Sequence, residues 1–124
     1  MWICLNDSFV SAVQDINRPS RLMVRSRRRN HLERLFPDHE ILTTIRSDYA
    51  HRVFVERDDF KRVLVDQVNL VTYSNFKDSV RDPVLHDLYL DFWMLHCSAN
   101  SPRNINPYRG RHFAKSSRHL RHMF

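Results

Sequence analysis

The charged residues of this 124-residue chain divide it into a neutral body and a basic tail. Residues 1–100 carry 14 Lys and Arg against 14 Asp and Glu, and the remaining basic residues of the 20 in the chain lie in residues 101–124, which have no acid. A neutral body can fold as an ordinary domain, but an acid-free tail has to find anions, solvent or an acidic groove. We therefore predict a single domain over residues 1–100 and a basic C-terminal tail over 101–124. The basic residues of the tail are Arg103, Arg109, Arg111, Lys115, Arg118 and Arg121.

The body is long and apolar enough to bury a core. The chain is 42% hydrophobic and 11% aromatic, more than in disordered chains of low hydrophobicity. No apolar run approaches the ~20 residues that span a bilayer, and the N-terminus lacks the pattern of a secretory signal. We therefore expect a cytoplasmic protein that does not bind membranes. We expect Cys4 and Cys97 to be free, buried thiols, although a disulfide between them remains an alternative.

The chain has a single glycine, Gly110, and it lies in the tail. Loops that cradle phosphates need glycine where the backbone approaches the phosphate closely or adopts a positive φ. The body therefore contains neither a P-loop nor a dinucleotide-binding fingerprint, which excludes most nucleotide-dependent enzymes. The eight histidines are not spaced like the ligands of a metal site, so we expect no metal and no other cofactor.

Short apolar segments separated by turn residues predict an antiparallel sheet. The first three follow one another with brief connections, one of them a hairpin loop over residues 15–20, as in an antiparallel meander. We predict an α+β fold, with an antiparallel sheet of about five strands and two or three helices packed mainly on one face. The expected strands span residues 2–5, 9–14, 22–27, 40–45 and 49–55.

Three segments have helical periodicity and helix start signals. Asn30 and Glu33 are spaced to cap a first helix, and apolar residues recur at helical intervals after Asp58. Asp82 before Pro83 predicts the start of the last helix. Its broad apolar face predicts deep burial, with His96 as a hydrogen-bonded core residue. The expected helices span residues 30–36, 58–71 and 83–97.

A set of motifs spread over residues 1–93 indicates a family relationship. The motifs are Met1-Trp2-Ile3, Leu5-Asn6-Asp7, Leu22–Glu33 with its arginine run, Asp48-Tyr49 with Arg52, Tyr73 with Asn75-Phe76-Lys77, and His86-Asp87 with Tyr89 and Trp93. They resemble a widespread family of small bacterial proteins that have no assigned function. The family usually carries a second Tyr-Arg step after Asp48-Tyr49, where this chain has Ala50-His51-Arg52. The resemblance implies a compact α+β domain in a bacterial setting and supplies no catalytic residues.

Two groups of basic residues are candidates for binding anions. The tail is suited to the phosphates of a nucleic acid, because each neutralised phosphate releases counterions. The alternative for the tail is a solvated terminus. The second group follows the third expected strand, where positive residues also discourage pairing between sheet edges. The candidate anion-binding residues of this second group are Arg25, Arg27, Arg28 and Arg29.

A third group mixes acidic, basic and phenolic side chains. Such a mixture can hold an anionic ligand or carry out acid–base chemistry. The structural alternative makes Asn75 and Asp78 caps or turns and pairs Asp48 with Arg52 on a strand surface. The possible ligand cluster is Asp48, Tyr49, Arg52, Tyr73, Asn75 and Lys77.

Taken together, these features predict a small non-enzymatic binding or regulatory protein. Its expected partner is an anionic macromolecule, either nucleic acid or an acidic protein surface. An inhibitor from a phage or mobile element is one form that such a protein takes. The alternative is a small enzyme or small-anion-binding protein built on Tyr49, Arg52 and Lys77.

Overall fold

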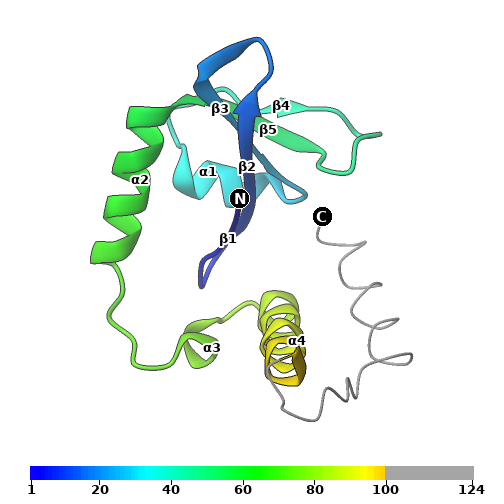
Figure 1. Ribbon diagram of the computed structural model, residues 1–124, viewed down its shortest axis with the longest axis vertical. Coiled ribbons are helices and arrows are strands. Elements are labelled where there is room, and N and C mark those ends of the chain that lie inside the picture. Colours follow the sequence, from blue (N-terminus) through cyan, green and yellow to red (C-terminus); the bar gives the residue numbers. More distant parts are fainter. Residues whose placement is uncertain (100–124) are drawn as a thin grey trace.

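The computed structural model describes residues 1–99, which form an α+β fold built on one antiparallel sheet (Figure 1). The strand order is β1-β2-β3-β5-β4, so the two shortest strands lie at the edges. Every neighbouring pair is antiparallel. This confirms the predicted fold class. The strands are β1 (Trp2–Cys4), β2 (Phe9–Asp15), β3 (Arg18–Ser26), β4 (Leu42–Thr43) and β5 (His51–Glu56).

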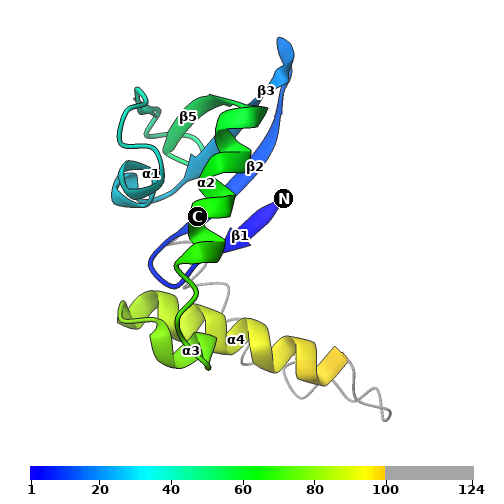
Figure 2. The ribbon, with the colours of Figure 1, turned by 90° about the vertical axis from the view of Figure 1, so that its left-hand side faces the viewer.

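Two helices cover one face of the sheet, and two lie near the start of β2 (Figures 1 and 2). No helix within the described part of the chain is long and apolar enough to cross a membrane. Asp82 caps the last helix as expected, because its Oδ1 accepts hydrogen bonds from the backbone of Val84 at 2.9 Å and Leu85 at 3.1 Å. The helices are α1 (Arg29–Leu35), α2 (Arg57–Asn69), α3 (Phe76–Ser79) and α4 (Pro83–Ala99).

The main core lies between the sheet and the helices α1 and α2. Alternate strand residues point into it, because successive side chains of a strand face opposite sides. Helix α1 contributes Leu32 and Leu35, and α2 contributes Phe60, whose ring stacks on Phe36 at 6.0 Å between centroids. The buried strand residues of this core are Val10, Ala12, Leu22, Val24, Val53 and Val55.

A second, smaller cluster joins α4 to the start of β2. Leu85, Leu88 and Tyr89 of the helix pack with Phe9 and Val80. The expectation that the whole helix is deeply buried is wrong for its C-terminal half, where Trp93 is 52% exposed and His96 and Cys97 are also exposed. The helix lies beneath the end of the sheet, so only the part near Phe9 meets the core (Figure 2).

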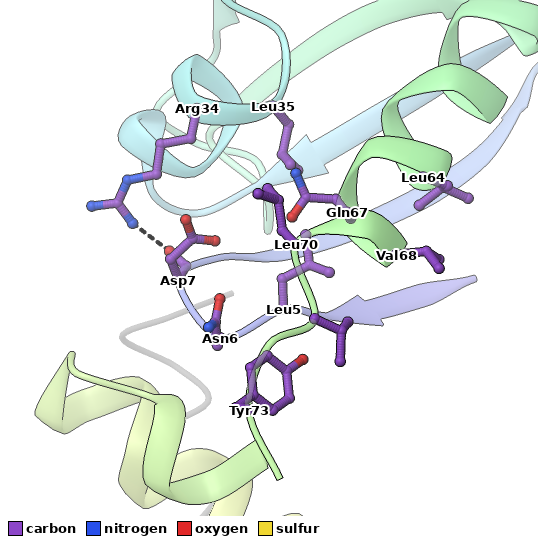
Figure 3. A pocket seen from close by; sticks show the side chains of 11 residues that line it. Leu5, Asn6, Asp7, Arg34, Leu35, Leu64, Gln67, Val68, Leu70 and Tyr73 are labelled. Atoms are coloured by element: carbon purple, nitrogen blue, oxygen red, sulfur yellow. Dashed lines mark hydrogen bonds between the residues drawn. The ribbon is translucent and has the colours of Figure 1, made fainter. Parts of the chain in front are cut away.

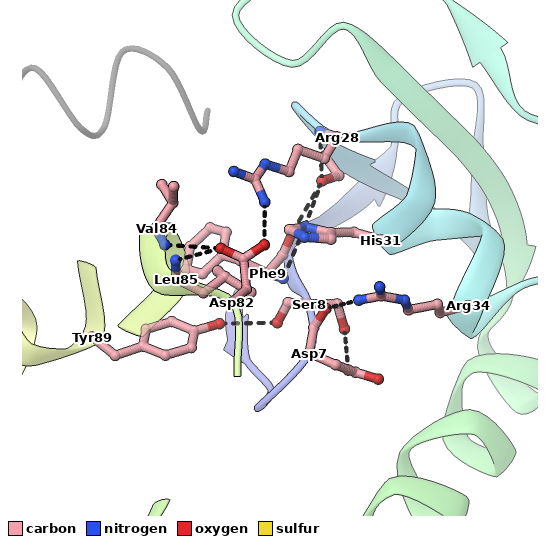
Figure 4. A network of polar contacts seen from close by, with 11 residues as sticks. Asp7, Ser8, Phe9, Arg28, His31, Arg34, Asp82, Val84, Leu85 and Tyr89 are labelled. Atoms are coloured by element: carbon pink, nitrogen blue, oxygen red, sulfur yellow. Dashed lines mark hydrogen bonds and ion pairs between the residues drawn. The ribbon is translucent and has the colours of Figure 1, made fainter. Parts of the chain in front are cut away.

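Polar contacts hold α4 in this position (Figure 4). Arg28 donates to Asp82 at 2.7 Å, so the carboxylate that caps α4 also pairs with the end of β3. Tyr89 donates its hydroxyl to the backbone carbonyls of Leu5 and Ser8, each at 2.9 Å. The hydroxyl has one hydrogen, which these two acceptors share. Helix α4 is therefore anchored by its N-terminal half.

Three local predictions are wrong in detail. The loop expected over residues 15–20 is a two-residue turn, because Asp15 already pairs with Arg18. Helix α1 has Arg28 at its N-cap with no side-chain cap, so Asn30 and Glu33 form no capping box; Glu33 instead pairs with Arg29 at 2.8 Å. Both cysteines are free, as expected, but they are exposed rather than buried.

Candidate anion-binding face

The face of the sheet opposite α1 and α2 carries one continuous row of side chains across all five strands. The pairing register sets Trp2 opposite Ser11, Ser11 opposite Arg25, and Arg25 opposite Arg52. Leu42 of the edge strand β4 completes the row opposite Arg52. Directly opposed residues of antiparallel strands share a face. The register therefore places two arginines side by side in the middle of the sheet.

Arg25 and Arg52 contact neutral groups. The guanidinium of Arg25 lies 4.6 Å from the centre of the Tyr49 ring and donates to Ser11 Oγ at 3.2 Å. Arg52 donates to Ser47 Oγ at 2.9 Å. Within residues 1–99 neither arginine forms an ion pair with a carboxylate, and the buried Nε of each lacks a hydrogen-bond acceptor. Their positive charge is therefore not neutralised by the described part of the domain.

Arg27 follows the end of β3 and lies near Tyr49, whose ring also contacts Arg25. Burial lowers the pKa of Arg27, and the nearby Asp48 and Tyr49 oppose that shift. The guanidinium stays protonated at any physiological pH. We call Arg25, Arg27 and Arg52, together with Tyr49, the arginine face.

An aromatic cavity of about 370 Å³ lies where β1 meets α4. Trp2, at one end of the row, is 63% exposed and contacts Phe9 edge-on at 6.0 Å between ring centroids. Although the residue as a whole is exposed, partial desolvation of its thiol raises the pKa of Cys4 to about 11. Because this thiol is neutral at pH 7, it is not an activated nucleophile. The lining residues are Trp2, Cys4, Phe76, Tyr89, Phe92, Trp93 and His96.

A second cleft, of about 710 Å³, opens between the β1–β2 loop, α1 and the end of α2 (Figure 3). Its walls include Val68 and Val71, which are 70% and 54% exposed, so the apolar face of α2 is only buried near Phe60. Arg34 lies at the cleft and donates to the backbone carbonyl of Asp7. The cleft therefore combines apolar walls with a single arginine that already has an acceptor.

The predicted ligand cluster is divided among separate places. Asp48, Tyr49 and Arg52 belong to the arginine face or its border. Tyr73 and Asn75 line a polar pocket of about 610 Å³, and Asn75 also caps α3 by accepting from the backbone of Asp78 at 3.2 Å. Lys77 lies over the Trp93 ring, 4.2 Å from its centre.

The basic residues predicted to bind anions lie in different surroundings. Arg25 and Arg27 lie on the arginine face, whereas Arg28 pairs with Asp82 and Arg29 with Glu33. The basic residues of the tail lie outside the described residues. Residues 1–99 contain no group of three or more His, Cys, Asp or Glu side chains that could hold a metal ion.

Two residues of this region were not predicted as site residues from the sequence. The sequence indicates Trp2 as part of a strand and of the Met1-Trp2-Ile3 motif, but not as a binding residue, and Ser11 has no distinguishing feature. Alternation along β1 and β2 separates the faces of each strand, but the neighbour of each residue depends on the pairing register. Only the register places Trp2 in a row with Arg25.

Comparisons with models of known protein families, with curated proteins and with solved structures gave no match to this chain.

Proposed function

We propose that this chain is a small non-enzymatic protein that binds nucleic acid through the arginine face. The observation that carries the proposal is the opposition of Arg25 and Arg52 across β3 and β5 without a carboxylate partner in residues 1–99. Phosphate is the natural ligand for guanidinium groups, which bind it with two parallel hydrogen bonds.

The energetics of the sheet favour an external anion. Like charges directly opposite each other in neighbouring strands destabilise a sheet. The ring of Tyr49 offsets part of this for Arg25 through a cation–π contact. A bound phosphate would neutralise both arginines and accept from their donors, so binding would relieve a cost that the free domain carries.

Nucleic acid accounts for the site better than an acidic protein surface does. An acidic surface would use the arginines alone. The same row of the sheet also presents Trp2, and aromatic side chains on a sheet are the surfaces on which unpaired bases stack. The acid-free segment 101–124 would add long-range attraction to the same polyanion.

The enzyme alternative gains no support from the arrangement of its three residues. Tyr49 packs on Arg25, Arg52 donates to Ser47, and Lys77 lies over Trp93. None of the three lines the cavities described above. We therefore keep the binding function as the single proposal.

The test is a salt titration of binding to RNA and DNA oligonucleotides by the full chain. The variant Arg25→Gln/Arg52→Gln should bind more weakly. The steepness of its plot of log K against log salt should decrease by about 1.4, the value expected for the loss of two phosphate contacts to a single strand. The control Lys61→Gln/Arg62→Gln removes the same charge from two exposed positions of α2.

The control should keep the native slope. Equal losses in the two variants would mean that net charge alone drives binding, and the arginine face would then have no special role. The first variant loses the contacts of the two arginines with Tyr49, Ser11 and Ser47, and the removal of two opposed like charges offsets part of that loss. Its free energy of unfolding should therefore fall by no more than about 1 kcal/mol. Full-length protein that binds neither oligonucleotide at low salt would overturn the proposal.

A further inference from the structure

We infer that the ligand is a single strand, and that one of its bases inserts into the aromatic cavity and stacks on Trp2. This inference rests on the proposed function. It adds that the bound nucleic acid is single-stranded and that one of its bases contacts Trp2. The phosphates would then lie at Arg25 and Arg52, and the base at the Trp2 end of the same row.

The cavity is suited to a flat aromatic group. Its volume of about 370 Å³ falls in the range of pockets that hold small molecules. Trp2 and Trp93 both line it and are 63% and 52% exposed, so each offers ring surface to a ligand. Lys77 lies 4.2 Å from the centre of the Trp93 ring and keeps a positive charge beside the cavity. An uncharged apolar ligand could form no ion pair with Lys77. A nucleotide carries a phosphate close to its base, and that phosphate could form one.

The cavity and the arginine face lie along the same row of the sheet. Neighbouring strands lie about 4.8 Å apart. Two strand spacings separate Trp2 from Arg25, and three separate Trp2 from Arg52. The separations are therefore about 10 and 14 Å, which consecutive nucleotides of an extended strand can bridge. Ser11, between them, is buried and accepts a hydrogen bond from Arg25 at 3.2 Å, so it helps to position that guanidinium.

A duplex does not satisfy this geometry. Its bases are paired and stacked on their neighbours, so a base reaches a side cavity only after it is unstacked, at a cost of a few kcal/mol. A single strand has no such cost, and aromatic stacking accepts any base because every base has a π-face. We therefore expect little sequence preference and a clear preference for single strands over duplexes.

The experiment compares three probes of about 12 nucleotides, a length typical of single-strand binders. They are an oligothymidylate, an abasic strand with the same number of phosphates, and a duplex of mixed sequence. The full chain should bind the oligothymidylate about 5- to 150-fold more tightly than the abasic strand, the fold-change for one stacked base. Tryptophan fluorescence tests the contact with Trp2 directly. The chain has two tryptophans, so the variant Trp93→Phe leaves Trp2 as the only one. The fluorescence of Trp2 should be quenched by the oligothymidylate and not by the abasic strand.

The variant Trp2→Ala should lose that preference and keep its affinity for the abasic strand. Ile16→Ala is the matched control, because Ile16 is a 93% exposed apolar residue at the far end of β2. Thermal melting establishes that both variants are folded, and Trp93→Ala provides a second test of the same cavity.

The outcomes separate this inference from the proposed function. Equal affinity for the oligothymidylate and the abasic strand, or binding to the duplex as tight as to the single strand, would overturn the inserted base and leave phosphate binding in place. Failure to bind any of the three probes would overturn both.

Discussion

At the scale of single residues, His31 is the most deeply buried titratable group of the domain, with 1% of its surface exposed. Its Nδ1 accepts a hydrogen bond from the backbone of Phe9 at 3.2 Å. Its Nε2 is also buried and has no hydrogen-bond partner within residues 1–99. Burial lowers the pKa of His31, and the charges of Arg28 and Arg34 lower it further. The folded domain therefore favours the neutral imidazole.

This environment predicts a loss of stability at mildly acidic pH. Below the ordinary histidine pKa of about 6.5, the unfolded chain takes up a proton at His31 that the folded chain resists. The free energy of unfolding should therefore fall as the pH decreases from 7 to 5. Urea unfolding of His31→Asn should show a smaller fall over the same interval. An equal fall in both proteins would assign the effect to other groups, such as His51, whose pKa burial also lowers.

The thiol of Cys4 leads to a second residue-scale prediction. Only the thiolate reacts with alkylating agents. With a pKa raised to about 11, Cys4 has on the order of a hundredfold less thiolate at pH 8 than an ordinary cysteine. Cys4 should therefore react with iodoacetamide more slowly than Cys97, as measured by peptide mass spectrometry on the folded protein. In urea the two rates should converge, and a faster Cys4 in the folded state would contradict the prediction.

Some residue-scale features that depend on near neighbours were predictable from the sequence, although the capping box expected at Asn30 and Glu33 does not form. Asp82 and Asn75 cap their helices because the donors they bind lie two or three residues ahead. The opposition of Arg25 and Arg52 was not predictable, because it joins residues far apart in the sequence through a register that no local pattern fixes. The residues of the arginine face were therefore predictable one by one, whereas their position beside one another comes from strand pairing.

At the scale of secondary-structure elements, α4 has two halves with different energetic roles. Leu88 is fully buried, so Leu88→Ala should lower the free energy of unfolding by about 2–5 kcal/mol. Trp93 is half exposed and faces the aromatic cavity, so Trp93→Ala should cost no more than about 1 kcal/mol. Chemical unfolding of the two variants measures both values. Similar costs would show that α4 is buried uniformly.

The elements themselves were predicted better than their surroundings. Apolar periodicity located every strand and the three longer helices, because it reports which face of each element is apolar. It does not report whether another element covers that face. The apolar stripe of α2 continues past Phe60 to Val68, which lines an open cleft rather than the core. The apolar face of α4 continues in the same way into the aromatic cavity.

At the scale of the whole molecule, both buried clusters lie within residues 1–99. A chain that ends at residue 100 should therefore fold with a melting temperature close to that of the full chain. Its affinity for nucleic acid should fall without vanishing, because the arginine face remains while the six basic residues after position 100 are lost. Melting curves and salt titrations of both chains test this. Unfolding of the shortened chain would place part of the core beyond residue 100.

The short strands at the edges of the sheet limit how the molecule can associate. Among the strands of residues 1–99, β1, with three residues, and β4, with two, lie at the edges, whereas the long strands β2, β3 and β5 are paired on both sides. A second copy or an extended peptide would find few free backbone groups along which to add a strand. The domain should therefore remain monomeric at high concentration and resist conversion to fibrils. Under the proposed function, binding would then take place across the faces of the sheet, through side chains, and not by extension of the sheet.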